Sequence, residues 1–386
     1  MNIDCIKHLY NEGKISLDVE AGITVKIRDD VFRPGTVRMH LPAPINAEWL
    51  KEGRLIDSDP MFRMMSVEDF PQRSAYFNEI LAKNTPFAIS YGFYSEHEYI
   101  CPDISLIDDT KQKDFTKEDI ARFSAAGHCG CESYTALAPD KVTIRDVAPE
   151  KGIKFKESYK EFLKANGIDA DKCLSSAENN DNVVIPDVLK RGTLARSIYD
   201  LVVDKYALCE DETLNIVFVT MCRMCGVPAR WQGGWALSDY IEDSSIETDA
   251  AVIKHDWAIV NLQPYGWVYV DCSFAKRADN ITIPGTDVLL KDFFFGNIDP
   301  CMVPTASAPA ADLYPAKDYV RADEIYNYRG EVELVPGKMN VNDQAEGYGL
   351  KAHEFDTEIY IKCDVTWSDE SLDDYTPYKK KQMIKE

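Results

Sequence analysis

A histidine and an aspartate lie in neighbouring stretches that predict two strands of a hairpin. His255 opens the apolar run HDWAIVNL, Asp271 ends the run WVYVD, and the turn residues QPYG lie between them. Across paired strands, an aspartate carboxylate can hold an imidazole in one tautomer, so that the ring can take the proton of a nucleophile. Because the sequence leaves the hairpin register open, a hydrogen-bonded core histidine is the alternative to this pairing.

The segment before these strands predicts a helix inside the protein. Residues 212–226, ETLNIVFVTMCRMCG, have an acidic first turn and an apolar middle, and Gly226 followed by Pro228 ends them. A helix that is apolar nearly all round is buried. Two further helices are expected at 155–167 and 186–208, and the strand ARWQGGWAL follows Pro228.

The two ends of the chain carry strand patterns. Residues 15–27 and 85–100 alternate apolar and polar side chains, and the run DTEIYIKCDV does the same near the C-terminus. We therefore expect an N-terminal β-rich domain at 1–105, a core at 106–305 and a C-terminal segment at 306–386 with a returning strand. The predicted class is α+β, with an antiparallel β domain followed by a helix packed on an antiparallel sheet.

Composition and charge exclude several kinds of partner. The formal net charge of −22 is the wrong sign for a phosphate backbone, so no nucleic-acid partner is expected. No apolar run approaches the roughly 18 residues of a membrane helix, and the start MNIDCIKHLYNEGK does not resemble a signal peptide. We expect a cytoplasmic protein with no membrane partner, whose eleven cysteines are free thiols. Since no convincing phosphate loop or metal motif is present, no cofactor and no metal are expected.

Two longer motifs resemble the core of bacterial transglutaminase-like proteins. One is CRMCGVPARWQGGW, which begins at Cys222, and the other is KHDWAIVNLQPYGWVYVDCSF, which begins at Lys254. The resemblance extends over roughly residues 145–360. It implies a papain-like fold with a Cys–His–Asp triad, in which a cysteine begins the buried helix and the sheet supplies His255 and Asp271.

The resemblance also implies a class of reaction. A thiol-dependent amidase, peptidase or acyltransferase would attack a peptide or glutamine amide and form a thioester, which water or an amine then resolves. A peptide or protein is therefore the expected partner. Hydrolysis versus transfer, the substrate and the oligomeric state stay open.

The nucleophile has two candidates, of which Cys209 is the first. In the family pattern the cysteine precedes the arginine of the helix by twelve residues, and Asp211 holds that position relative to Arg223. Cys209 is the nearest thiol. The adjoining acids Glu210, Asp211 and Glu212 would raise its pKa, and the helix dipole offsets only part of that effect.

Cys129 is the second candidate and the one we favour. It lies in 127–132, GHCGCE, which fits the family's loop G-[DH]-C-G-x-[QE] better than the region of Cys209 does. Its flanking glycines permit close approach of the backbone. Residues 104–138 would then be an unusual insertion that brings the loop to the same helix end.

Two alternatives concern the cysteines. Because Asp211 takes the expected nucleophile position, the protein could be an inactive relative that binds peptides or proteins. Cys129 and Cys131 could also join Cys222 and Cys225 in a zinc site of four thiolates, although positions 222 and 225 are ordinary core positions of a helix.

Two tryptophans flank the motif and could bind substrate. Trp231 and Trp257 lie on the two expected strands nearest the histidine. Their rings could shape a substrate channel, but aromatic residues on strands more often pack in a core.

Overall fold

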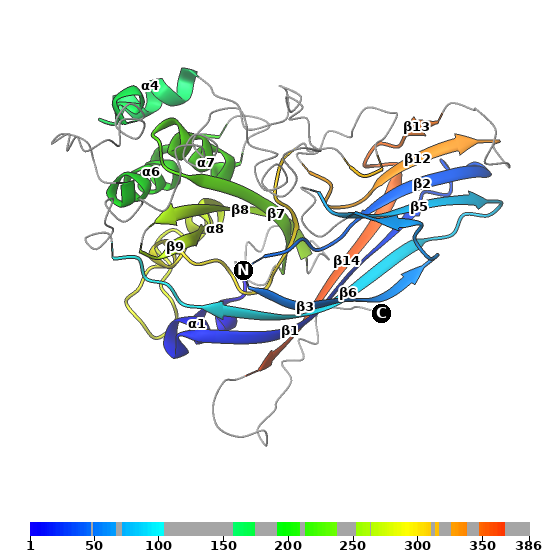
Figure 1. The fold of residues 1–386 in the computed structure, drawn as a ribbon, viewed down its shortest axis with the longest axis horizontal. Helices are drawn as coiled ribbons and strands as arrows, with labels where there is room; N and C mark the ends of the chain where they lie inside the picture. The colour runs from blue at the N-terminus through cyan, green and yellow to red at the C-terminus, as the bar shows by residue number, and fades with distance from the viewer. Residues whose placement is uncertain are drawn as a thin grey trace.

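A helix-covered sheet and a pair of long-stranded sheets make up the described part of the chain (Figure 1). The computed structural model describes residues 1–47, 49–66, 72–103, 157–173, 191–208, 213–237, 252–262, 264–309, 313–315, 326–337 and 347–366. Within these ranges every pairing between strands is antiparallel. The predicted α+β class is confirmed.

The two long-stranded sheets pack on each other as a β-sandwich. Their strand orders are β14–β1–β6–β3 and β13–β12–β2–β5–β4. The N-terminal strands are β1 (Lys14–Ile27), β2 (Gly35–Pro42), β3 (Leu50–Asp59), β4 (Met64–Met65), β5 (Ser74–Leu81) and β6 (Phe87–Glu98). The C-terminal strands are β12 (Glu331–Pro336), β13 (Tyr348–Gly349) and β14 (Phe355–Thr366). Between the sheets, Phe77 and Phe87 meet edge to face with ring centroids 5.5 Å apart.

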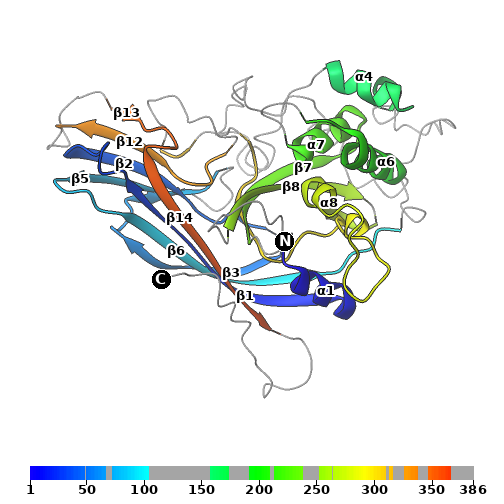
Figure 2. The same ribbon diagram turned by 180° about the vertical axis from the view of Figure 1, so that it is seen from behind.

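Both ends of the chain build this sandwich. β14 pairs with β1 from Ser16 opposite Thr366 to Ile27 opposite Phe355, and β12 pairs with β2. Figure 2 shows β14 running beside β1, with the helical half on the far side of the molecule from β5 and β13. The first and last described strands of the chain are thus neighbours in one sheet, although they are far apart in the sequence.

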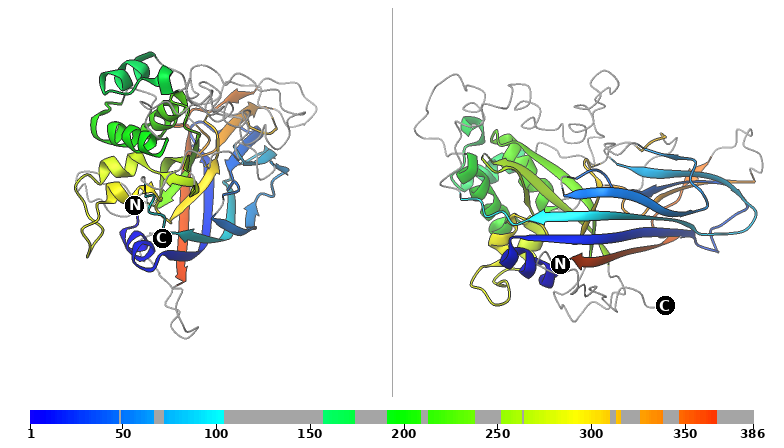
Figure 3. Two further views of the ribbon diagram at one scale, coloured as in Figure 1. Left: turned by 60° about the vertical axis from the view of Figure 1, so that its left-hand side comes forward. Right: turned by 60° about the horizontal axis from the view of Figure 1, so that its bottom comes forward.

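The core has its own five-stranded sheet in the order β10–β9–β8–β7–β11. Its strands are β7 (Ala229–Leu237), β8 (Val252–Leu262), β9 (Gly266–Val270), β10 (Phe295–Gly296) and β11 (Met302–Ala306). The described helices include α1 (Ile3–Glu12), α4 (Glu157–Ala165), α6 (Arg191–Lys205), α7 (Leu214–Met224), α8 (Cys272–Arg277) and α9 (Leu290–Phe293). Figure 3 shows the helices gathered at one end of the long strands.

Helix α7 is the buried helix expected at 212–226. Thr213 begins it as N-cap, where its hydroxyl oxygen accepts the Ile216 N–H at 3.1 Å. Every residue of the helix is buried, and each large apolar side chain there contributes about 1.5–3 kcal/mol by leaving water. Gly226 then takes the left-handed conformation at φ 75°, which ends the helix. The helices expected at 155–167 and 186–208 are α4 and α6.

Helix α1 was not predicted, and it ties the N-terminus to the core. Asn2 caps it by accepting the Cys5 N–H at 3.1 Å, and the Asn2 N–H donates to the buried carboxylate of Asp299. The amino group of Met1 donates to the carbonyl oxygen of Leu237 at 3.2 Å. These polar contacts join the first residues to strand β7 and to the segment before β11.

Candidate active site

His255 and Asp271 form a buried pair at the end of the core sheet. The His255 Nε2 and Asp271 Oδ2 atoms are 2.6 Å apart, and the side chains are 3% and 0% exposed. Asp271 follows β9 directly and is the N-cap of α8, where its Oδ1 accepts the Phe274 N–H at 2.9 Å. The two residues predicted to lie together therefore do so, with Asp271 at a strand-to-helix junction.

Three hydrogen bonds hold Asp271 in place, two at its carboxylate and one at its backbone N–H. Oδ1 is engaged by the helix cap and Oδ2 by His255, while the Asp271 N–H donates to the Phe294 carbonyl at 3.0 Å. A carboxylate that accepts at Oδ2 keeps the imidazole proton on Nε2, which leaves a lone pair on Nδ1. This tautomer is assigned from the hydrogen-bond partner. Nδ1 is then the ring atom that can take a proton from a nucleophile.

Aromatic rings set the plane of the imidazole. The Phe274 ring of α8 stacks on His255 with centroids 3.9 Å apart and planes 21° apart. Trp257 lies further along β8, with its ring centroid 6.4 Å from that of His255. Asp271 is the N-cap of α8 and Phe274 lies in its first turn, so this short helix orients His255 through both side chains.

Asn215 connects the start of α7 to this pair, a role that the sequence analysis missed. Its Nδ2 donates to the Asp256 carbonyl at 2.7 Å and to the Ser273 hydroxyl at 3.1 Å, and its Oδ1 accepts the Cys272 N–H at 2.8 Å. The side chain is fully buried. The signal in the sequence was a single amide within an otherwise apolar helix start, where burial requires partners.

Asp256 makes a second connection, through its side chain. Its Oδ2 accepts hydrogen bonds from the Trp231 Nε1 at 2.7 Å and from the Thr213 hydroxyl. Burial raises the pKa of Asp256, and the neighbouring His255 and the two hydrogen bonds oppose that rise. The N-cap residue of α7 is thereby bonded to the residue that follows His255 on β8.

We predict that Asp256→Asn will reveal the cost of this buried charge. Because the pKa of Asp256 is raised in the folded state, the folded protein keeps a proton that the unfolded chain has lost above about pH 4. Ionisation therefore lowers stability as the pH rises, whereas asparagine accepts the same hydrogen bonds without ionising. In urea titrations, the free energy of unfolding of the variant should gain on that of the wild type between pH 4 and pH 7. A free energy of unfolding of the variant that falls relative to that of the wild type as the pH rises from 4 to 7 would contradict the prediction.

The two tryptophans lie in the core. Trp231 and Trp257 are 1% and 0% exposed. The Trp231 indole N–H is bonded to Asp256, and that of Trp257 donates to the Gln232 Oε1 at 2.9 Å. In this conformation neither ring presents surface to a ligand, so these contacts describe the packing role that was the alternative to a substrate channel.

The candidate nucleophiles lie outside the described residues. This holds for Cys129 and Cys209, and also for Asp211 at the position expected from the family pattern. The described chain resumes at Thr213, the cap of α7. His255, Asp271 and the start of the buried helix are thus joined by hydrogen bonds, and the thiol that would complete a triad remains a prediction.

The cysteines of the zinc hypothesis divide in the same way. Cys129 and Cys131 lie outside the described residues, while Cys222 and Cys225 are buried at the end of α7. No cluster of three metal-binding side chains occurs among the residues that the structure describes. Cys222 and Cys225 therefore have the core positions that their helical spacing indicated.

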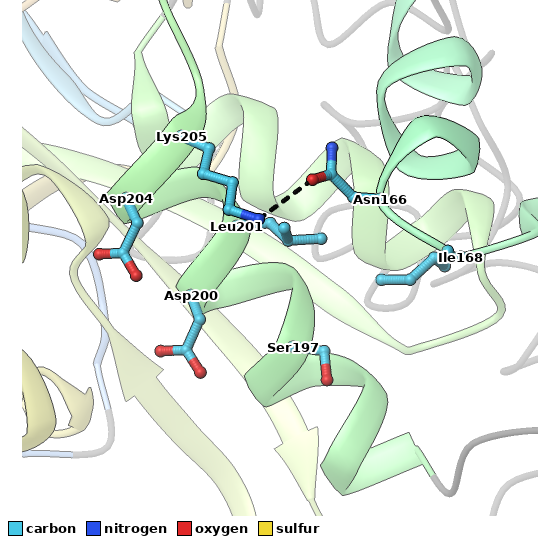
Figure 4. A pocket seen from close by; sticks show the side chains of 8 residues that line it. Asn166, Ile168, Ser197, Asp200, Leu201, Asp204 and Lys205 are labelled. Atoms are coloured by element: carbon cyan, nitrogen blue, oxygen red, sulfur yellow. Dashed lines mark hydrogen bonds between the residues drawn. The ribbon is translucent and has the colours of Figure 1, made fainter.

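A shallow pocket of about 410 Å³ lies apart from this site, between α6 and the turn after α4 (Figure 4). Its carboxylates are already paired: Asp200 lies 3.1 Å from Arg196, and Asp204 lies 2.7 Å from Lys291. His255 and Asp271 are not part of its lining. We therefore assign the pocket no part in the chemistry.

Residues 190–272 match the sequence model of the transglutaminase-like superfamily. The match runs from the start of α6 through α7, β7, β8 and β9 to the residue after Asp271, so it contains both members of the buried pair. The central part of the chain is therefore transglutaminase-like, as its motifs predicted. Among the described residues, no helix is both long and apolar enough to cross a membrane.

Solved structures resemble the chain at low identity. A candidate cysteine protease from Cytophaga hutchinsonii is 12% identical, with a TM-score of 0.37, over 96% of this chain and 95% of that one. The periplasmic domain of TgpA from Pseudomonas aeruginosa is 10% identical, with a TM-score of 0.22, over 71% of this chain and 92% of that one. No curated protein matches the chain.

Proposed function

We propose that the protein is a thiol-dependent amidase, peptidase or acyltransferase of the transglutaminase-like type. The observation that carries this proposal is the buried His255–Asp271 pair, with 2.6 Å between Nε2 and Oδ2. Hydrogen bonds of Thr213 and Asn215 also connect the start of the buried helix α7 to the residues next to this pair. Backbone N–H groups at a helix start favour a thiolate and a developing oxyanion.

The reaction would use His255 as base and then as acid. His255 Nδ1 takes the thiol proton while the sulfur forms a bond to the carbonyl carbon of a peptide or glutamine amide. The tetrahedral intermediate loses its amine as the C–N bond breaks, and the imidazolium gives that amine the proton. Water or a second amine then attacks the thioester carbonyl carbon while His255 takes its proton. The C–S bond breaks, the acid or the new amide leaves, and His255 returns the proton to the sulfur, which restores the free thiol. Asp271 stabilises the imidazolium and keeps its orientation.

For the nucleophile we propose Cys129, with Cys209 as the alternative. The glycines on both sides of Cys129 permit close approach of the backbone. Cys129 has only one acidic neighbour, whereas the three consecutive acids that follow Cys209 would raise the pKa of that thiol. Trp231 and Trp257 would help to position the site. Trp231 donates a hydrogen bond to Asp256, and the Trp257 ring lies near the imidazole of His255.

We further propose a cytoplasmic protein that acts on peptides or proteins. The eight described cysteines are all unbridged, and this includes Cys5 and Cys301, whose sulfur atoms are 3.7 Å apart. Free thiols are typical of proteins in a reducing compartment. The acidic surface gives no basic footprint for nucleic acid.

Cysteine labelling combined with substitution tests the proposal. The protein is treated with iodoacetamide at neutral pH, the labelled thiols are mapped by mass spectrometry, and amine release is followed with peptide amides and glutamine-containing peptides. Cys101 is exposed and supplies the reference rate. We expect one thiol to react about tenfold faster than Cys101 or more, and both Cys129→Ser and His255→Asn to abolish amine release while Cys209→Ser retains it.

The other outcomes are equally informative. Activity that survives Cys129→Ser and is lost with Cys209→Ser would move the nucleophile to Cys209. If no thiol outpaces Cys101 and no amide is cleaved or transferred, the thiol-enzyme proposal fails. The inactive peptide- or protein-binding module, which the acid at Asp211 favours, would then be the better account.

A further inference from the structure

The hydroxyl of Tyr326 reaches the backbone of His255 from outside the core sheet. It lies 2.8 Å from the His255 carbonyl oxygen and 2.8 Å from the Gly234 carbonyl oxygen, and it accepts the Gly234 N–H at 3.1 Å. Its single proton is therefore shared between two carbonyl groups on the paired strands β7 and β8, where Gly234 lies opposite His255. Burial raises the pKa of Tyr326, so that the hydroxyl remains a donor.

The ring of Tyr326 packs into a space that is open because residue 233 is a glycine. The side chain is 1% exposed, and its ring meets that of Trp231 edge to face with centroids 5.3 Å apart. A Cβ atom at Gly233 would lie 2.5 Å from the Trp231 ring and 3.0 Å from the Tyr326 ring. The glycine thus permits the close packing that brings the hydroxyl to the strands.

The segment that carries Tyr326 is bound to the β-sandwich. The Asn327 N–H donates to the Gln72 Oε1 at 2.9 Å, two residues before β5, and its Nδ2 donates to the His40 carbonyl of β2 at 3.1 Å. Gly330 then closes a turn by donating its N–H to the Asn327 Oδ1 at 2.9 Å, and β12 begins at the next residue. On the other side, the Trp235 indole N–H donates to the Tyr328 carbonyl at 2.7 Å.

We propose that Tyr326 is a positioning residue for His255, through which the β-sandwich holds the candidate active site in place. The inference rests on the proposed function, since it assigns His255 a role in proton transfer. The Nε2 to Oδ2 distance is 2.6 Å, and a hydrogen bond weakens as its two atoms move apart. The imidazole therefore keeps its bond to Asp271 only if the backbone of residue 255 stays in place. Tyr326 holds that backbone, and Asn327 holds Tyr326.

The experiment compares Tyr326→Phe with Tyr328→Phe. Both variants remove one hydroxyl from the same aromatic cluster, in which the two rings are 5.9 Å apart, but the Tyr328 hydroxyl contacts the guanidinium of its neighbour Arg329. The first measurement is the low-field imidazole N–H proton of His255 in the NMR spectrum of the full chain, assigned with His255→Asn. The second is kcat and KM for amine release.

We expect the Tyr326→Phe variant to lose or broaden the His255 N–H signal, while Tyr328→Phe retains it. The kcat of Tyr326→Phe should fall about fivefold to tenfold at nearly unchanged KM, the scale of one misplaced hydrogen-bonded group. A uniform structural loss would instead lower the signals of other buried groups as well and raise KM. The Tyr328 hydroxyl is not expected to restore the His255 signal in Tyr326→Phe, because it contacts Arg329.

Two results would overturn the proposal, and one would concern only the function. A folded Tyr326→Phe variant with the wild-type His255 signal contradicts the positioning role. If Tyr326→Phe does not fold, Asn327→Ala leaves the hydroxyl in place, and an unchanged signal in that variant contradicts the role equally. If the wild type cleaves no amide, the proposed function fails, while the His255 signal still decides the role of Tyr326.

Discussion

Replacing Asp271 by asparagine should lower kcat for amide cleavage by about 10⁴-fold while the protein stays folded. Asparagine serves as well as aspartate at a helix N-cap, so the bond from the Phe274 N–H to the side-chain oxygen can persist. The amide has no charge to stabilise an imidazolium, and its NH₂ can donate to Nε2. The imidazole would then carry its proton on Nδ1, the atom that must accept one.

Asp271→Ala separates the two roles of this residue. Alanine removes the helix cap as well as the partner of His255, so the free energy of unfolding should fall by about 0.5–2 kcal/mol from the cap alone. The asparagine variant should unfold at nearly the wild-type urea concentration and yet be as inactive as the alanine variant. An asparagine variant whose kcat stays within tenfold of the wild type would remove Asp271 from the mechanism.

Replacing Ile361 by aspartate should destabilise the protein by more than about 4 kcal/mol, since it places an unpaired charge in the core. Ile361 is fully buried on β14, opposite Ala21 of β1. Because a native domain has only about 5–15 kcal/mol of stability, the variant should be largely unfolded or close to it. The loss should appear in urea titrations followed by circular dichroism.

Lys362→Ser is the matched control for this substitution. Lys362 is the next residue of β14, and its exposed side chain reaches the Glu20 carboxylate at 3.3 Å. A surface ion pair of this kind contributes less than about 1 kcal/mol, so the control should unfold close to the wild type. Equal stability of the two variants would mean that β14 is not packed on the sandwich as described.

Local patterns made the central elements predictable. The buried helix at 212–226 followed from its apolar residues on every side, and its stop followed from Gly226 and Pro228. The pairing of His255 with Asp271 followed from two apolar runs around a turn, together with motifs of the transglutaminase-like superfamily. These signals lie within a short stretch of chain, but the hairpin register that brings the two side chains together came from the structure.

The contacts that hold the pair were not predictable in this way. Thr213 and Asp256 are 43 residues apart, and Tyr326 and His255 are 71 apart. Each is a polar contact made by a residue type that is common on surfaces, so the sequence has no mark that distinguishes it. Asp271 illustrates the difference: its presence near the histidine was predicted, whereas its service as the cap of α8 depends on where β9 ends.

By itself, then, the sequence determined the α+β class, the buried helix and the residues His255 and Asp271, because hydrophobic period and motif spacing are properties of neighbouring residues. Only the tertiary structure decided that β14 closes on β1, that Asn215 and Asp256 join the start of α7 to β8, and that Tyr326 brings the sandwich to the backbone of His255. Such contacts form when distant segments are packed together and every buried polar group must find a partner in the assembled core.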